Sequence, residues 1–297
     1  MKKKLTPMKK IITILVFTII SFNGFSQEDS EVTQKSNVQT YTPSKLLKKG
    51  QWDIKWFNNL FTQTKSADSN GDIAKDLDRE TYFTSSIDIF TGVSKNSNIN
   101  VGLLAEIRSN VIGDRNALDV FSFDGEIGTA RSGLTSIAPV IKFNPLKNVS
   151  NFTVQTAIHI PLIDNESENG VFLDQTAYTF QNRFFYDYTF PSGDWQLFTE
   201  LNAEYNFGDD NSFANKTFVL APGVFMSYFP SDKSTILGFI QHLQRFGDFD
   251  QDFTALGFGG KYQLTQTLNL EVLYSSFVRG TNSGIGQSFN IGLRALF

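Results

Sequence analysis

The residue types that carry most enzymatic chemistry are scarce in this chain, which contains two histidines and no cysteine. A Ser–His hydrolase needs a serine and an orienting polar group beside its histidine, and neither His159 nor His242 has a serine at a suitable spacing. The stretch Asp68-Ser-Asn-Gly71 holds a serine in an acidic segment, without a histidine beside it. We therefore expect a protein that is not an enzyme, with no catalytic residues and no cofactor. Without cysteine or paired histidines, the sequence also predicts no transition-metal site.

Two acidic clusters could attract divalent cations, because carboxylate oxygens are the ligands that calcium prefers. They are Asp164-Asn-Glu-Ser-Glu168 and Asp248-Phe-Asp-Gln-Asp252. Neither matches the Asp-x-Asp-x-Asp-Gly spacing with a distal glutamate that specifies a calcium loop, so solvated loop tips are the favoured interpretation. The formal net charge is −4 and basic clusters are absent outside the N-terminus. Nucleic acid is therefore excluded as an expected partner, because phosphate binding needs grouped Lys and Arg.

Apolar residues occupy every second position at the C-terminus, namely Phe289, Ile291, Leu293, Ala295 and Phe297. Period two is typical of a strand with one apolar face and one polar face. Such a strand at a free edge invites aggregation, whereas a closed barrel in a membrane has no edge. The pattern resembles outer-membrane β-barrels of Gram-negative bacteria, whose last strand alternates and ends in Phe. This resemblance implies that Phe289, Ile291, Leu293 and Phe297 are an assembly signal, with the barrel-assembly machinery and outer-membrane lipid as partners.

The N-terminus has the pattern of a secretory signal peptide. Its basic start contains Lys2, Lys3, Lys4, Lys9 and Lys10, and the apolar run Ile11–Ile20 follows. That run is shorter than the roughly 20 residues of a spanning helix, so we expect cleavage after Ser26. Residues 27–50 are polar and predict a flexible periplasmic tail, with one helical turn at 44–49.

From residue 51 to residue 297, the alternation and the turn residues predict a transmembrane antiparallel up-and-down β-barrel of about twelve strands, and thus an all-β fold. Most expected strands have 10 to 14 residues, which suits the 9–11 that cross a bilayer at a tilt. A soluble sandwich of short strands is the competing interpretation. The expected strands are 51–64, 80–93, 99–109, 134–143, 152–163, 177–190, 195–206, 217–229, 235–245, 253–264, 268–279 and 287–297.

The connections alternate between longer and shorter segments. The expected long loops are 65–79, 110–133, 164–176, 207–216, 246–252 and 280–286, and they carry most of the acidic loop residues. Long outer loops and short inner turns are typical of an outer-membrane barrel with both termini in the periplasm. The sequence therefore predicts location in the cell outer membrane in that orientation.

The polar face of each strand should point into the lumen. The expected inward charges number seven of each sign, and they are Asp53, Lys55, Asp88, Glu106, Arg108, Lys142, Arg183, Asp187, Glu200, Glu204, Lys261, Glu271, Arg279 and Arg294. Seven of them are our candidate pore-lining residues, namely Glu106, Arg108, Arg183, Glu200, Glu204, Glu271 and Arg294. The charges either pair across the lumen and fill it, or form rings along a polar pore. Residues 235–245 split their polar side chains between both faces and remain unassigned.

Within the class of outer-membrane barrels, Leu220-Ala-Pro-Gly-Val224 and its flanking strands are similar to transporters linked to the meta pathway of phenol degradation. The resemblance implies uptake of small solutes, with aromatic ones among the candidates. The segment Tyr178–Phe190 is rich in Tyr and Phe, and it either offers a stacking surface to such solutes or belongs to a lipid-facing girdle. We expect a channel or transporter for passive uptake of small solutes, and a non-conducting structural or surface-interaction barrel is the alternative. The substrate, the oligomeric state and the openness of the lumen do not follow from the sequence.

Overall fold

The computed structural model describes residues 42–113, 115–209 and 212–297. All of these residues belong to one compact unit, Thr33–Phe297. The predicted signal peptide, 1–26, and residues 27–41 of the predicted tail lie outside the described residues.

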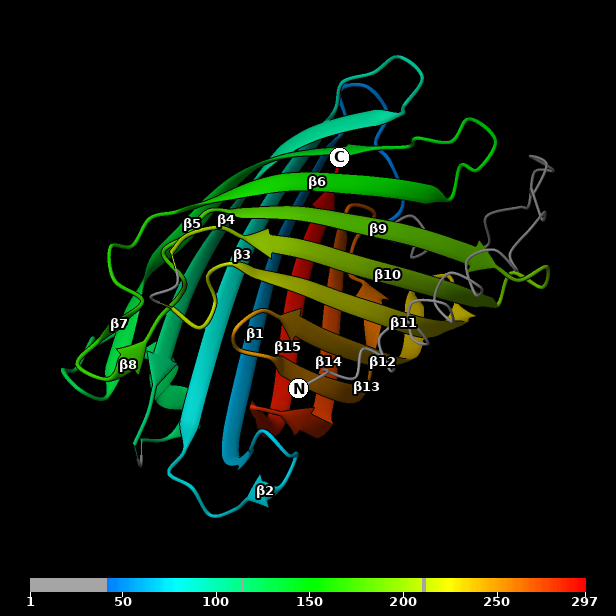
Figure 1. Ribbon diagram of the computed structural model, residues 1–297. Coiled ribbons are helices and arrows are strands. Elements are labelled where there is room, and N and C mark those ends of the chain that lie inside the picture. The colour runs from blue at the N-terminus through cyan, green and yellow to red at the C-terminus, as the bar shows by residue number, and fades with distance from the viewer. Residues whose placement is uncertain (1–41, 114, 210–211) are drawn as a thin grey trace, which may run out of the picture. The chain divides into compact units, whose positions relative to one another are not determined.

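Twelve long strands form one antiparallel sheet in which each strand pairs with its neighbour in the chain. The last strand pairs with the first, from Asp53↔Leu296 to Ala67↔Ser283, and this pairing closes the barrel (Figure 1). The predicted all-β, up-and-down barrel of twelve strands is confirmed. The strands are β1 (Trp52–Ala67), β3 (Glu80–Gly92), β4 (Ile99–Val111), β5 (Ala130–Phe143), β6 (Phe152–Pro161), β9 (Thr179–Thr189), β10 (Trp195–Asn206), β11 (Thr217–Ser231), β12 (Ser234–Phe246), β13 (Gln251–Gln263), β14 (Leu268–Thr281) and β15 (Ser283–Leu296).

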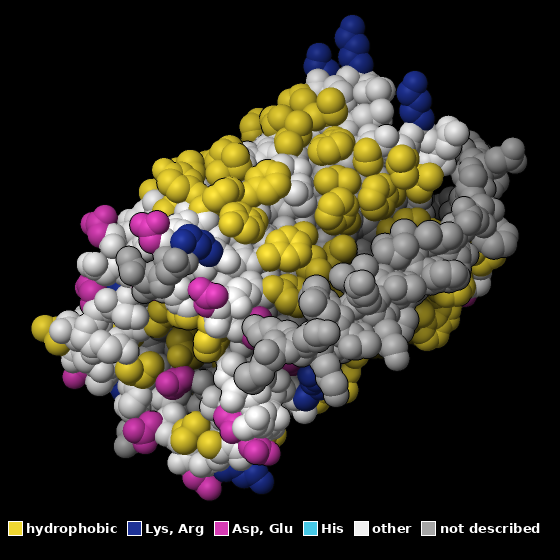
Figure 2. All heavy atoms as spheres, in the orientation of Figure 1, with side chains coloured by type: hydrophobic (Ala, Val, Ile, Leu, Met, Phe, Trp, Pro, Cys, Tyr) yellow, Lys and Arg dark blue, Asp and Glu magenta, His cyan; other side chains and the backbone are white. Residues whose placement is uncertain are grey.

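Every second side chain along each strand points away from the lumen. These outward residues are mostly apolar, so the outer wall is apolar. Trp56, Ile87, Leu103, Val272 and Ile291 are all exposed on it. Figure 2 shows hydrophobic side chains spread over the middle of the visible wall, with acidic side chains gathered at the end that carries β2, β7 and β8. Such a band with polar ends matches the hydrocarbon layer and its two interfaces.

Short elements occur only in the longer connections of the described chain. They are β2 (Ile73–Ala74), the 3-10 helix η2 (Ala117–Phe121), β7 (Ser167–Glu168) and β8 (Val171–Phe172), with β7 and β8 forming a small hairpin. No helix within residues 42–297, leaving aside 114, 210 and 211, is long and apolar enough to cross a membrane.

Two local expectations are wrong. The long loop expected at 280–286 does not exist, because β14 and β15 continue through it and are joined by Asn282 alone, whose φ is 50°. Asparagine tolerates this left-handed conformation better than most residues, so the chain turns in a minimal connection. The helical turn expected at 44–49 is also absent, since residues 45–48 form no regular element and turns occur only at 43–44 and 50.

β-Bulges explain one further error. A register shift lies in the β13–β14 pairing between Thr254 and Ala255, opposite Arg279 and Phe277. One extra residue in a strand reverses the face of everything beyond it. Arg279 therefore does not join the inward charges; its side chain is 63% exposed and pairs with Asp252 at 2.9 Å.

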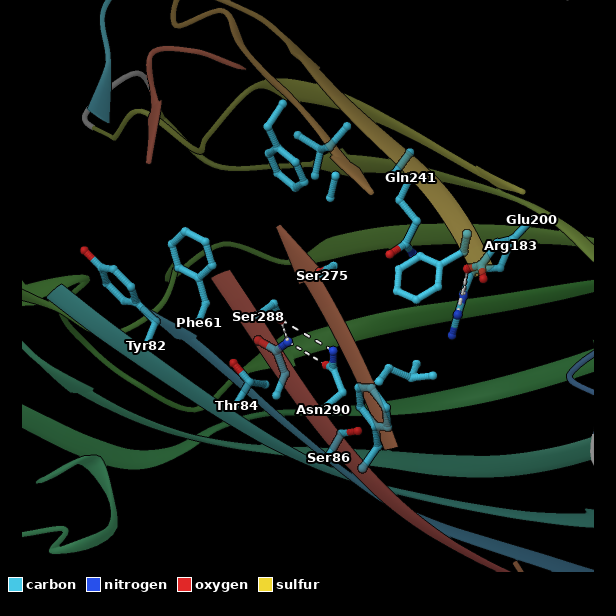
Figure 3. A pocket seen from close by; sticks show the side chains of 18 of the residues that line it. Phe61, Tyr82, Thr84, Ser86, Arg183, Glu200, Gln241, Ser275, Ser288 and Asn290 are labelled. Carbon is cyan, nitrogen blue, oxygen red and sulfur yellow. Dashed lines mark hydrogen bonds and ion pairs between the residues drawn. The ribbon is translucent and has the colours of Figure 1, made fainter. Parts of the chain in front are cut away.

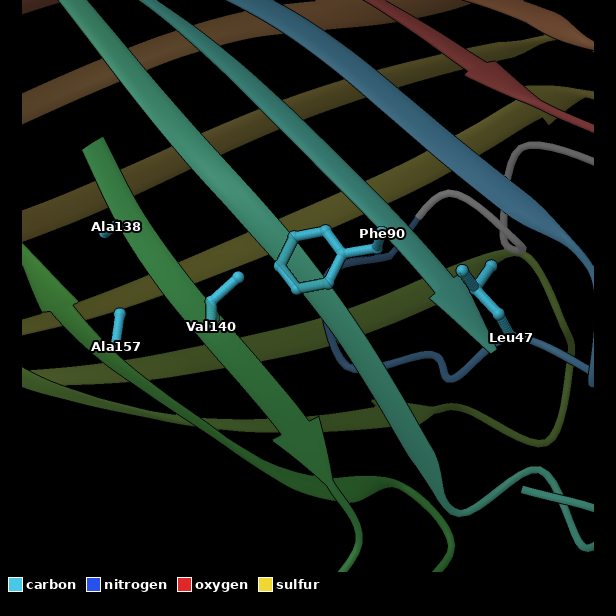
Figure 4. Packing of buried hydrophobic residues seen from close by; sticks show 5 residues of the cluster. All are labelled: Leu47, Phe90, Ala138, Val140 and Ala157. Atoms are coloured by element: carbon cyan, nitrogen blue, oxygen red, sulfur yellow. The ribbon is translucent and has the colours of Figure 1, made fainter. Parts of the chain in front are cut away.

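Two clusters of buried apolar residues lie against the barrel wall. The inner cluster contains Leu47, Phe90, Ala138, Val140 and Ala157, so it joins the N-terminal segment to strands β3, β5 and β6 (Figure 4). The outer cluster contains Phe83, Val111, Val120 and Ala130.

Candidate functional site

The barrel encloses a cavity of about 1150 Å³, and each of the twelve long strands contributes side chains to its lining. Figure 3 shows Thr84, Ser86, Ser288 and Asn290 on one part of the wall and Arg183 with Glu200 on another, all directed into the same space. The cavity exists because the inward positions carry a mixture of small polar, charged and aromatic residues, rather than the large apolar side chains that fill smaller barrels.

Five of the seven candidate pore-lining residues border this cavity, namely Glu106, Arg108, Arg183, Glu200 and Glu271. The other two engage neighbouring side chains. Glu204 accepts hydrogen bonds from Gln181 at 2.8 Å and Asn202 at 2.7 Å. Arg294 makes a two-pronged ion pair with Asp53, at 2.8 and 2.6 Å.

The inward charges pair along the wall. Arg183 of β9 lies 2.6 Å from Glu200 of the adjacent β10, and Lys261 of β13 lies 2.8 Å from Glu271 of the adjacent β14. Lys55 of β1 lies 4.0 Å from the same Glu271. Since the partners come from adjacent or nearly adjacent strands, these pairs neutralise the wall without bridging the lumen. Two charges that balance each other locally leave little net field for selecting either sign of ion.

A run of phenylalanine rings lines the wall from β9 to β12. The ring centroids of Phe185 and Phe198 are 6.0 Å apart, those of Phe198 and Phe225 are 5.4 Å apart, and those of Phe225 and Phe239 are 5.3 Å apart. Three of these four residues border the cavity, and Phe185 is buried beside them. Each ring contacts the next across the sheet, so the wall presents a continuous aromatic surface there.

A second group of rings lies on β1, β3, β13 and β14. Phe277 lies 4.2 Å from Phe253 and 4.7 Å from Phe61, and Tyr82 lies 6.3 Å from Phe61, measured between ring centroids. All four border the cavity. The expected stacking surface at Tyr178–Phe190 contributes Phe185 to the first group. The other rings were expected to face lipid, because apolar strand residues suit lipid as well as an aromatic pore wall. Residues 235–245 show this ambiguity most clearly, since β12 places Leu237 and Phe239 on the cavity side.

The described N-terminal segment, residues 42–50, lies at the end of the cavity that carries the short turns. Thr42 and Pro43 border the cavity itself. The Ser44 hydroxyl donates a hydrogen bond to Asp187, and the Lys142 ammonium donates to the carbonyl of Pro43. Lys142 also donates to the carbonyl of Lys45 at 3.2 Å.

The same segment is anchored further along by its backbone. The amide of Leu47 donates to Asn100 Oδ1 at 3.1 Å, and its side chain is 6% exposed within the inner cluster. Gly92 gives the segment room, because a Cβ there would lie 2.2 Å from the carbonyl oxygen of Lys48. The segment therefore narrows this end of the lumen by specific contacts.

The loop between β6 and β9 narrows the opposite end. Asn110 donates to the carbonyl of Phe172 at 2.8 Å, and Asp174 lies 3.0 Å from Arg108. Burial raises the pKa of the Asp174 carboxyl above its usual range, and Arg108 offsets part of that effect. The Phe172 ring contacts Phe213 at 5.5 Å. Loop side chains therefore extend the aromatic lining to the mouth of the cavity.

The two histidines make contacts that do not form a catalytic dyad with serine. His159 Nε2 lies 3.4 Å from Gln181 Oε1, and His242 Nδ1 lies 2.9 Å from Thr254 Oγ1. Among the described residues, no three of the His, Asp and Glu side chains are grouped as a metal site would require.

This geometry defines the chain as a twelve-stranded outer-membrane β-barrel with a lined internal cavity. The chain belongs to the family described as "Putative MetA-pathway of phenol degradation", whose pattern matches residues 110–295. The resemblance inferred from the sequence is thus confirmed.

Solved structures with a similar fold include an outer membrane channel from Pseudomonas putida F1. It is 9% identical, with 86% of this chain and 98% of that chain covered and a TM-score of 0.67. The beta domain of the Bordetella autotransporter BrkA is 14% identical, with 82% of this chain and 99% of that chain covered and a TM-score of 0.54. At these identities the likeness concerns the fold. No curated protein matches the sequence.

Proposed function

We propose that this barrel is a passive channel for small solutes, with a preference for flat aromatic ones. The observation that carries the proposal is the cavity of about 1150 Å³ that runs inside the closed wall, bordered by all twelve strands. A barrel filled by its own side chains would have no such space. Family membership and the channel from Pseudomonas putida support the same role.

The aromatic lining supports the choice of solute. Contact between two aromatic rings contributes roughly 0.5–1.5 kcal/mol beyond simple burial. The rings of Phe198, Phe225 and Phe239 on one side, and of Phe61 and Phe277 on the other, offer several weak sites in the same lumen. Passage requires binding that is weak and repeated, and a series of ring contacts meets this requirement. The paired charges Arg183–Glu200 and Lys261–Glu271 lie on the same strands as the rings and add polar groups to the lining.

The proposed orientation places both termini and the short turns in the periplasm, with the longer loops outside the cell. Cleavage after Ser26, assembly through the C-terminal residues Phe289 to Phe297, and the absence of any catalytic step belong to the same proposal. The first four outer connections support it, because residues 68–79, 112–129, 162–178 and 207–216 are each longer than any inner one, as is usual in barrels of this class. The last two outer connections, residues 247–250 and Asn282, are short.

The test is an osmotic swelling assay on liposomes that contain the mature protein, residues 27–297. Benzenesulfonate is compared with cyclohexanesulfonate, which has a similar size and equal charge, because both sulfonic acids stay ionised and neither anion crosses a bilayer readily. We expect faster swelling with benzenesulfonate, and loss of this preference in a Phe61→Ala, Phe277→Ala double variant that still admits both solutes. Phe258→Ala, which removes a ring from the outer wall, is the matched control. Equal rates for both solutes in the wild type would refute the aromatic preference, and no swelling with either would refute the channel.

One observation favours a second candidate function, a non-conducting barrel. The N-terminal segment is held in one end of the lumen by Ser44, Leu47 and Lys142. If the segment never leaves, the barrel would serve as a scaffold for its loops. The swelling assay separates the two functions directly.

A further inference from the structure

In the connection between β4 and β5, residues 115–129 lie against the outside of the barrel. Val120 of η2 is fully buried, and it packs with Phe83, Val111 and Ala130. Alternation along the strands puts these residues on the same face as Ile87, Ile107 and Leu134, which are exposed. We define residues 115–129 of this connection as the outer collar.

The contacts of the collar with the wall are specific. The Ser109 hydroxyl donates to the carbonyl of Val120 at 2.6 Å. The Phe83 ring meets Phe121 edge-on at 5.0 Å and Phe123 at 6.4 Å. As a result Phe83 is 6% exposed, while Ile87, four residues along the same face, is 41% exposed. The collar thus replaces lipid over the loop end of β3, β4 and β5.

The height of this contact follows from strand geometry. Trp52 is 43% exposed at the short-turn end, where an aromatic girdle is expected, and it pairs with Thr91 of β3. Phe83 lies eight residues further along β3. At about 3.4 Å per residue and a tilt of about 40°, Phe83 is roughly 21 Å above the lower girdle. The apolar band of such barrels is about 25 Å tall, so the collar packs against the wall within it.

The collar also exposes large apolar side chains. Leu118 is 68% exposed and Ile127 81%, and Phe121 and Phe123 remain 51% and 47% exposed beside Phe83. The polar residues of the collar are tied together, since Arg115 contacts Asp119 at 3.3 Å, Asp124 at 2.7 Å and Glu126 at 3.0 Å. One guanidinium therefore gathers three carboxylates into a single charged cluster.

We propose that the outer collar inserts into the outer leaflet of the membrane and anchors the barrel there, with lipid acyl chains as its partner. The apolar surface of the collar continues the lipid-facing wall on which it lies, and that continuity identifies the occupant. Aromatic and aliphatic side chains at this depth match the interface between acyl chains and headgroups. The Arg115 cluster would lie at the headgroup level, where its charges remain hydrated.

The test uses the absence of native cysteine, which allows single-site labelling. Leu118→Cys carries a polarity-sensitive fluorophore in the mature protein, refolded into phospholipid vesicles. Ile87→Cys on the wall is the lipid reference, and Lys75→Cys, exposed in the loop before β3, is the water reference. Each labelled protein must show the heat-modifiable gel migration of a folded barrel.

We expect a label at Leu118 to resemble the label at Ile87. Spin-labelled lipid should quench it strongly, and aqueous iodide should quench it severalfold less than at Lys75. Quenching by iodide equal to that at Lys75, without quenching by lipid, would overturn the proposal and leave the collar as a water-exposed surface for a protein partner. A label at Ile127 serves as a second position and must agree.

Discussion

Leu47 is the buried apolar side chain that anchors the N-terminal segment in the lumen, and its truncation should release part of the segment population. Its side chain is 6% exposed and packs with Phe90, Ala138, Val140 and Ala157. None of these barrel residues changes in Leu47→Ala, so the variant weakens the seating of the segment while the wall remains intact. Gly92→Ala should weaken the seating of the same segment through a change in the wall, because its Cβ would lie 2.2 Å from the carbonyl oxygen of Lys48.

The size of the effect follows from the buried side chain. Losing the burial of a leucine side chain costs about 2–3 kcal/mol when the site partly relaxes. A factor of ten in an equilibrium corresponds to 1.4 kcal/mol, so the ratio of released to seated segment should rise about 30- to 150-fold. The hydrogen bonds of Ser44 and Lys142 remain in this variant, so release should stay partial.

Limited trypsin digestion of the folded protein in detergent measures this ratio. Lys45, Lys48 and Lys49 are cleavage sites within the segment, and cleavage tracks the released population when reseating is fast. Mass spectrometry of the liberated N-terminal peptide gives the rate. Gly238→Ala is the matched control, because a Cβ there comes no closer than 3.9 Å to its nearest neighbour. Equal cleavage rates in the wild type, Leu47→Ala and Gly92→Ala would refute the seating described here.

Three other predictions concern the charges and the C-terminus. Arg183→Ala leaves Glu200 unpaired on the cavity wall, so the reversal potential measured in a salt gradient should shift towards cation preference. Glu200→Gln should shift the reversal potential the opposite way. No shift in either variant would contradict the pairing along the wall. Because the pKa of Asp174 is raised by burial, its stabilising contribution is present below the ordinary pKa of an aspartate and lost as the pH rises through the raised value. The unfolding midpoint of the wild type should therefore fall, relative to Asp174→Asn, between acid and neutral pH, and a constant difference would count against this cause. Phe297→Ser should lower the yield of barrel inserted by the assembly machinery in cells while leaving refolding into detergent unchanged; equal loss in both assays would point to a merely structural role.

The barrel itself could be predicted because alternation reports a physical requirement directly. Each strand must present apolar side chains to lipid. In segments such as Trp195 to Tyr205 the alternating pattern that meets this requirement can be recognised from the local sequence alone. Turn residues such as those at 191–194 then separate the strands. The C-terminal strand was the clearest case, with Phe289 and Ile291 exposed on the outer wall.

The lining of the lumen could be predicted only where it is charged. A phenylalanine is compatible with lipid and with an aromatic pore wall, so Phe218 on the outer face and Phe225 on the inner face look alike in the sequence. The bulge that moves Arg279 to the outer side depends on the pairing of two strands and has no signal of its own.

Packing between segments that are far apart in the chain could not be predicted from the sequence. Residues 42–50 are polar on average, and nothing local indicates that Leu47 finds a cluster formed by β3, β5 and β6. The outer collar is a similar case. Its apolar residues predict no strand, and their position against Phe83 follows only once the barrel is closed.

The central claim, that the lumen is a passage for small solutes, is tested most directly by single-channel conductance in planar bilayers. The mature chain, residues 27–297, is compared with residues 51–297, which lack the segment seated in the lumen. We predict discrete conductance steps, with larger steps for the shorter protein because the contacts of Thr42, Pro43 and Leu47 are gone. Silence from both proteins, with β circular dichroism and heat-modifiable migration intact, would contradict the claim.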